Sequence, residues 1–364
     1  MRTPRRVIGG AALGTLLLTV AACGADDAAN DDDTATDESA TDDDAGESES
    51  GTDGAGGSGD AVDDEELAPG QHEFAAEIDG HDRSGVVLLP SGWTPDADLP
   101  LVVNLHGSGS DGAEQVLWSA ATGTADAEGY VVVLPDGGFE DPDGGRLWNV
   151  PGVTDAPDDA PDDIAFLQAL VDWSAEEYGT STQDVFATGY SGGGRMISQA
   201  ACDDPDLFRA IAPVTGLRSG APVEGEDGWV PDPATCEPDE VTPIVTFVGT
   251  DDPVNPLDGG GADYWRYGHE AALDRWAEIG GYEVREDTDQ GDGVTLTSIG
   301  DGEGPDEIRS WSIDGAGHVW PGSPAFEEET DWAGTPTDAI DANELIWDFF
   351  EQFLGENPTA DAGR

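Results

Sequence analysis

The sequence contains no lysine, and its 13 basic residues, all arginines, stand against 79 aspartates and glutamates. The formal net charge is therefore −66 at pH 7. Such a charge repels a phosphate backbone, which excludes nucleic acid as a partner. Dense acidic side chains repel one another less as salt rises and keep a protein soluble there, so the composition predicts a halophilic protein.

Cysteines and long apolar runs are also scarce. Only three cysteines occur, and a long run of apolar and small residues, 7–22, follows an arginine-rich start. This run is short for a membrane span and is typical of an export signal. Residues 20–23, Val-Ala-Ala-Cys, resemble the lipobox of bacterial and archaeal lipoproteins. The resemblance implies a lipoprotein signal peptide over 1–23 and lipidation of Cys23.

The implied protein is exported and lipid-anchored to the outer face of the cell membrane, which it contacts only through the lipid. An ordinary signal peptide with a chance cysteine is the alternative, and the export route, Sec or twin-arginine, stays open.

Residues 24–66 consist almost wholly of Asp, Glu, Ala, Thr, Ser and Gly. This composition cannot bury enough apolar surface to fold, so we expect a disordered acidic linker. Residues 67–364 are then a single catalytic domain.

Two cysteines are left once Cys23 carries a lipid. Cys202 and Cys236 form an even pair in an exported protein, where a disulfide persists, so we expect a bond between them. Two unrelated buried thiols are the alternative. The acidic runs lack the spacing of an EF-hand, and no motif implies a metal or a cofactor.

Strand-like and helix-like segments alternate along the rest of the chain. An opening hairpin is expected at 73–79 and 85–89, and short apolar runs typical of buried parallel strands follow at 101–105, 130–134, 185–188, 210–214 and 244–248. Helical patterns occur from Ile164 to Tyr178, over 262–279 and over 339–353. This alternation predicts an α/β fold, a doubly wound, mostly parallel sheet with helices on both faces.

The segment 189–193, Gly-Tyr-Ser-Gly-Gly, contains a candidate nucleophilic serine. A predicted strand runs into it and a helix follows, which is the arrangement that exposes a serine hydroxyl on a tight turn. In a chain this rich in glycine the motif alone is weak. Ser191 needs a base that is itself oriented by an acid before it can act as a nucleophile.

Candidates for both groups lie downstream of Ser191. A carboxylate pair, Asp251 and Asp252, follows an apolar strand, and His318 lies between a strand and the last helix. The order Ser, Asp, His is that of α/β-hydrolases. Of the five histidines, His318 is best placed to be the general base.

An acyl-transfer site also needs backbone donors for the developing oxyanion. Gly192 follows the serine and supplies one N–H, and we place the second at the Ser108 amide in a glycine-rich loop after the strand 101–105. His106, in the same loop, is a candidate substrate contact, although a structural role in shaping the loop is the stronger reading. Trp320 either borders the substrate pocket or packs beneath the loop of His318.

Five blocks, 99–107, 188–196, 248–256, 315–322 and 340–350, together resemble the polyhydroxybutyrate depolymerase and feruloyl esterase group of secreted α/β-hydrolases, akin to carbohydrate esterase family 1. The resemblance implies an α/β-hydrolase fold with Ser191 as nucleophile and His318 as base. It assigns the orienting acid to Asp252 rather than Asp251. Ser108 and Gly192 depart from residues common in the group, which leaves the acyl preference open.

The function expected from these residues is that of a serine esterase working through an acyl-enzyme. Its substrates would be small or oligomeric esters, either polyhydroxyalkanoate oligomers or feruloyl and acetyl esters of polysaccharides. An acyl-peptidase-type serine hydrolase and a catalytically inactive glycan-binding surface lipoprotein are the alternatives. The natural ester and the oligomeric state stay open.

Overall fold

A computed structural model describes residues 67–142, 144–226, 228–302 and 307–355. The expected signal peptide, Cys23 and the acidic linker 24–66 lie outside the described residues. Within them, no helix is both long and apolar enough to cross a membrane.

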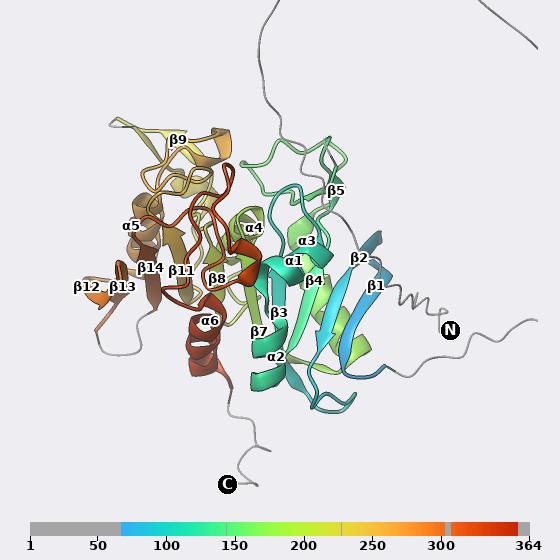
Figure 1. Cartoon of the computed structure of the whole chain (residues 1–364). Coiled ribbons are helices and arrows are strands. Elements are labelled where there is room, and N and C mark those ends of the chain that lie inside the picture. Colours follow the sequence, from blue (N-terminus) through green and yellow to red (C-terminus); the bar gives the residue numbers. More distant parts are fainter. Residues whose placement is uncertain (1–66, 143, 227, 303–306, 356–364) are drawn as a thin grey trace, which may run out of the picture. The chain divides into compact units, whose positions relative to one another are not determined.

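Ten strands form one sheet in the order β1-β2-β4-β3-β7-β8-β11-β14-β13-β12 (Figure 1). Their bounds are β1 Gly70–Ile78, β2 His81–Leu89, β3 Leu99–Leu105, β4 Val131–Pro135, β7 Thr180–Tyr190, β8 Ile211–Val214, β11 Ile244–Gly249, β12 Val284–Gly291, β13 Val294–Gly300 and β14 Ile308–Ile313. The central strands from β4 to β14 run parallel, and the strands toward both edges are antiparallel. The mostly parallel sheet predicted from the sequence is thus confirmed.

The expected opening hairpin is present as β1 and β2. The two strands pair from Ile78 and His81 outward, so Asp79 and Gly80 alone form the turn. Both have positive φ, 53° and 73°, which is the backbone of a two-residue type I′ turn. An aspartate followed by a glycine is a favoured pair for that turn, because neither residue strongly resists the left-handed conformation.

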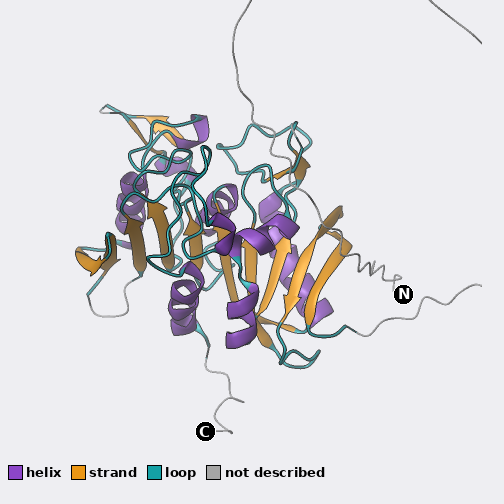
Figure 2. Cartoon of the chain, viewed as in Figure 1, coloured by secondary structure: helices purple, strands orange, loops and turns teal. Residues whose placement is uncertain are grey.

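Helices cover both faces of the sheet (Figure 2). They are α1 Gly112–Ser119, α2 Thr122–Glu128, α3 Asp163–Tyr178, α4 Gly192–Asp203, α5 His269–Gly280 and α6 Ala342–Phe350. In Figure 1, α1, α2 and α6 lie in front of the sheet and α3 lies behind it. Val102 packs in the core cluster that contains Trp347 of α6, while its neighbours Leu101 and Val103, both fully buried, point to the opposite face. The doubly wound arrangement follows from this two-sided burial.

Short elements complete the described chain. They are β5 Phe139–Glu140, β6 Arg146–Leu147, β9 Pro222–Glu224, β10 Trp229–Pro231, and the 3-10 turns η1 Pro233–Thr235, η2 Asp263–Trp265, η3 Pro324–Phe326 and η4 Glu351–Phe353. The disulfide expected between Cys202 and Cys236 is present and joins the end of α4 to the residue after η1.

Two predicted helices differ from the structure at their ends. The helix expected over 262–279 begins only at His269, because residues 265–267 use their backbone to pair with glycines 259–261 instead. The helix expected over 339–353 begins after Asp341, whose side chain accepts hydrogen bonds from the amides of Asn343 and Glu344. It ends as α6 at Phe350 and continues only as the 3-10 turn η4.

Candidate active site

Ser191 lies at the sharp turn between β7 and α4. Its backbone has φ 51° and ψ −107°, a strained conformation for a residue with a side chain. The turn is possible because glycines flank it: a Cβ on Gly189 would lie 2.5 Å from the carbonyl carbon of Gly193. A Cβ on Gly193 would collide with the carbonyl oxygen of Leu105 in β3. The motif's glycines are therefore required by the close approach of strand and helix.

His318 and Asp252 form a buried pair. His318 Nδ1 lies 2.7 Å from Asp252 Oδ2, and the two side chains are 2% and 0% exposed. The other carboxylate oxygen, Oδ1, accepts hydrogen bonds from the amides of Val254 and Asn255 at 2.8 and 2.7 Å. These bonds hold the carboxylate in one orientation toward the imidazole. Asp251 is exposed and takes no part in the pair.

Tyr190, the residue before the serine, connects the turn of Ser191 to the loop of His318. Its hydroxyl donates a 2.6 Å hydrogen bond to the carbonyl oxygen of His318, and the two rings lie 5.0 Å apart. Burial, together with the charge of Asp252, raises the pKa of Tyr190 well above its ordinary value, so the hydroxyl keeps its proton and remains a donor. The structure thereby brings the three sequence-predicted residues into one region at the carboxyl ends of the parallel strands.

The two expected oxyanion donors are neighbours. A Cβ on Gly192 would lie 2.8 Å from the amide nitrogen of Ser108, and a Cβ on Gly107 would lie 3.6 Å from Cβ of Ser191. The loop after β3 therefore runs directly beside the serine. Backbone hydrogen bonds from Gly109 to Arg146 and from Arg146 to Ser110, at 2.9 and 2.8 Å, hold the loop in place.

His106 and Trp320 are both buried, which favours the structural reading of His106 and the packing alternative for Trp320 over substrate contacts. His106 is fully buried: its Nδ1 lies 2.7 Å from the carbonyl oxygen of Gly107, and its Nε2 accepts the amide of Gly137 at 2.9 Å. Burial lowers its pKa to about 4, which keeps the ring neutral as these two bonds require. Trp320 is 1% exposed and packs in the apolar core with α6. His106 is thus held by hydrogen bonds within its loop, and Trp320 by packing in the core.

An aromatic group lies beside the candidate triad, and two of its members, Phe326 and Trp332, were not singled out as site residues from the sequence. The ring of Tyr190 contacts the rings of Trp118 and Phe326 at centroid distances of 5.5 and 5.8 Å. Trp332 packs against the same two rings, and the centroids of these three rings lie 6.0 to 6.2 Å apart. Trp332 is 49% exposed, and its neighbour Ala333 accepts the amide of His318 at 2.6 Å. Trp332 lies in an irregular loop where no periodic pattern marks it, so contact with the His318 loop could not be read from the sequence.

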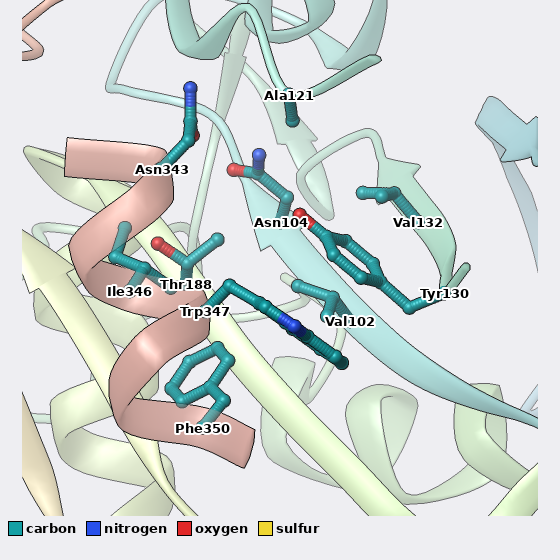
Figure 3. Close-up of a pocket in the computed structure, with 10 residues that line it drawn as sticks. All are labelled: Val102, Asn104, Ala121, Tyr130, Val132, Thr188, Asn343, Ile346, Trp347 and Phe350. Carbon is teal, nitrogen blue, oxygen red and sulfur yellow. The ribbon is translucent and has the colours of Figure 1, made fainter. Parts of the chain in front are cut away.

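A small cavity lies elsewhere, between α6 and the strands β3, β4 and β7 (Figure 3). Tyr130 stacks on Trp347 there, with ring centroids 4.3 Å apart, and none of the predicted site residues lines it. It is a packing defect of the core rather than part of the site. Within the described ranges, no group of three or more His, Cys, Asp or Glu residues could hold a metal ion.

Comparisons with known proteins show which chains this one resembles. A model described as the prolyl oligopeptidase family matches residues 117–219, which contain Ser191 but neither Asp252 nor His318. A protein of Nocardia uniformis subsp. tsuyamanensis named as an esterase, NocK, is 28% identical over 262 residues, covering 66% of this chain and 70% of that protein. Feruloyl esterase B of Piromyces equi is 32% identical over 185 residues, covering 49% of this chain and only 31% of that protein.

Solved structures with a similar fold are esterases and related hydrolases. An acetyl xylan esterase from Aspergillus awamori superposes with a TM-score of 0.53 at 16% identity, covering 78% of this chain and 99% of that one. An S-formylglutathione hydrolase from Agrobacterium tumefaciens gives 0.52 at 13% identity, covering 79% and 98%. At these identities the likeness concerns the fold, and the fold is that of the α/β-hydrolases.

Proposed function

We propose that this chain, a serine carboxylic-ester hydrolase, works through a triad in which Ser191 is the nucleophile, His318 the general base and Asp252 the orienting acid. The observation that carries the proposal is the buried pair of His318 and Asp252, held next to the strained turn of Ser191. A carboxylate on Nδ1 fixes the tautomer that leaves Nε2 free to take the serine proton.

The mechanism follows from these roles. His318 takes the proton of Ser191 as the hydroxyl attacks the ester carbonyl, and the amides of Gly192 and Ser108 bind the oxyanion. His318 then protonates the leaving alcohol. Water attacks the acyl-enzyme by the same path, which releases the acid and restores the serine.

The aromatic group supports an aryl acyl substrate such as a feruloyl ester. Trp332 is half exposed and stands against the loop of the base, where a flat ring could stack on it. Acetyl esters of polysaccharides and hydroxyalkanoate oligomers remain within the proposal. Both relatives described above are named as esterases, one of them a feruloyl esterase.

An acyl-peptidase activity is the second candidate, favoured by the match to the prolyl oligopeptidase model. That match covers the strand, turn and helix around the serine, which ester and peptide hydrolases share. A catalytically inactive glycan-binding protein would have no reason to keep the buried carboxylate of Asp252 against His318, since a buried carboxylate without a function is costly.

Purified wild type, Ser191→Ala and His318→Ala test the proposal, with His72→Ala as a control because His72 is a half-buried histidine on the edge strand β1, far from the pair in sequence. Methyl ferulate, short 4-nitrophenyl esters, hydroxybutyrate oligomers and acylated peptides are compared side by side, and a fluorophosphonate probe labels the nucleophile. Each triad variant should lose nearly all activity, because triad members act as a unit. More than about a tenth of the wild-type rate in Ser191→Ala would refute the assignment.

The proposal extends to the cell surface, with Cys23 lipidated and the enzyme tethered by residues 24–66. Its support is the lipobox-like segment alone. Cells fed a labelled fatty acid should mark the wild-type protein and leave Cys23→Ser unmarked.

A further inference from the structure

A buried arginine lies beside the proposed oxyanion donors. Arg195 is in the first turn of α4, four residues after Ser191, and only 4% of it is exposed. Its Nη2 donates a 3.0 Å hydrogen bond to Oγ of Ser108, and its guanidinium stacks 4.2 Å from the ring centroid of Tyr264. A Cβ on Gly192 would lie 3.4 Å from the same Nη2. The cation therefore touches the oxyanion loop on the side that faces Gly192.

Arg195 has no acidic partner among the described residues. Other arginines have one, as in the pair of Arg83 with Asp163 at 2.8 Å and of Arg275 with Glu278 at 2.9 Å. Nε and Nη1 of Arg195 are buried without any hydrogen-bond partner. Burial lowers its pKa to about 10, so the group remains charged at neutral pH. A chain with 79 acidic residues keeps this buried cation uncompensated, which is costly in the resting protein.

We propose that Arg195 is a positioning residue for the oxyanion hole, which holds the Ser108 amide in place and presents a positive charge to the developing oxyanion. The inference rests on the proposed ester hydrolysis. The ester substrate is neutral at its carbonyl oxygen, and the tetrahedral intermediate is negative there. The charge of Arg195 therefore gains a counter-charge only as the transition state forms, which is the condition for raising kcat rather than binding.

The chain offers a matched control in Arg218. It is 2% exposed, has no carboxylate partner among the described residues, and has its pKa lowered to about 10 by burial. Its guanidinium stacks 3.3 Å from the ring centroid of Tyr267 and donates to the carbonyl oxygen of Tyr267, not to Ser108. The charges of Arg218 and Arg195 act on each other, but Arg218 makes no hydrogen bond to Ser108, so its loss removes an equally buried cation without removing a contact to the oxyanion loop.

Four variants test the inference: Arg195→Met, Arg195→Lys, Ser108→Ala and Arg218→Met. For each, kcat and KM for a 4-nitrophenyl ester are measured per active site, counted by fluorophosphonate titration. Arg195→Met should lower kcat on the order of 10²-fold, as loss of an oxyanion donor does, with KM changed by less than about threefold. Ser108→Ala keeps the amide and the cation, so its kcat should fall by less, about tenfold. Arg218→Met should keep the wild-type kcat per active site.

The lysine variant separates charge from packing. A buried lysine has a depressed pKa, so Arg195→Lys should approach wild-type kcat near neutral pH and lose activity as the pH rises and the amine loses its proton. Up to about pH 9 the wild type should show no such loss, because the pKa of Arg195 is about 10. This pH profile is available even if Arg195→Met does not fold.

Wild-type hydrolysis and labelling are measured first, and their absence overturns the proposed function together with this inference. With an active wild type, an Arg195→Met kcat within about threefold of wild type overturns the role of Arg195 alone. Equal kcat losses in Arg195→Met and Arg218→Met would do the same, because any buried cation would then suffice. An alkaline limb for Arg195→Lys that matches the wild type would exclude the charge effect.

Discussion

The replacement of Asp252 by asparagine tests the candidate triad most directly. The carboxylate uses Oδ1 to accept two backbone amides, from Val254 and Asn255, and Oδ2 to face Nδ1 of His318 at 2.7 Å. In Asp252→Asn the amide oxygen must stay with the two backbone donors, because an NH₂ group there would face two N–H groups. The NH₂ group then faces Nδ1 of His318.

This forced orientation changes the imidazole. An NH₂ donor opposite Nδ1 requires Nδ1 to be the acceptor, so the ring proton moves to Nε2, the nitrogen needed to take the serine proton. We expect kcat to fall about 10³–10⁴-fold, the size of effect known for loss of the correct tautomer in serine hydrolases. Asp251→Asn should stay near wild type, because Asp251 is exposed and makes no contact with the ring.

The assay is hydrolysis of a 4-nitrophenyl ester across pH 6 to 9, with folding checked by circular dichroism and active sites counted by a fluorophosphonate. The reasoning would be refuted if folded Asp252→Asn kept its rate within tenfold of wild type, or if Asp251→Asn lost as much. The second result would transfer the orienting role to Asp251.

Three further predictions concern stability. The double change of Cys202 and Cys236 to serine should lower the free energy of unfolding by about 3 kcal/mol, because the bond closes a loop with a sequence separation of 34; a urea titration that matches the wild type would contradict this. His106 and His269 are buried with pKa values lowered from 6.5 to about 4, so the unfolded chain binds more protons between these values. Stability should fall as the pH drops from about 6.5 toward 4, by roughly 3 kcal/mol per histidine, and His269→Gln should remove about half of this loss in thermal melts, which an unchanged pH dependence would contradict. Finally, Tm should rise between 0.1 and 2 M NaCl as the Debye length shortens from about 10 Å to below 3 Å, and a flat or falling Tm would argue against a halophilic protein.

The sequence was sufficient where local pattern and burial coincide. The apolar runs that became β3, β7 and β11 are fully or mostly buried central strands, and such strands show as short continuous apolar segments. The segment around Ser191 was equally readable, because a strand, a tight turn and a helix demand glycine at fixed positions. The edge strand β12 was missed for the opposite reason. All of Val284–Gly291 is exposed, so buried and exposed residues do not alternate along it and the sequence shows no strand periodicity.

Which side chains of the site contact one another was decided only by the tertiary structure. Asp251 and Asp252 are adjacent and chemically identical, and the direction of each side chain depends on the turn that hydrogen-bonds Asp252 to Val254 and Asn255. Arg195 contacts Ser108, 87 residues earlier, and Trp332 packs against Trp118 in another distant segment, so neither contact can be read from local sequence. A sequence specifies local conformation through nearest neighbours, but the approach of distant side chains depends on how the whole sheet packs, and that packing carries no local signature.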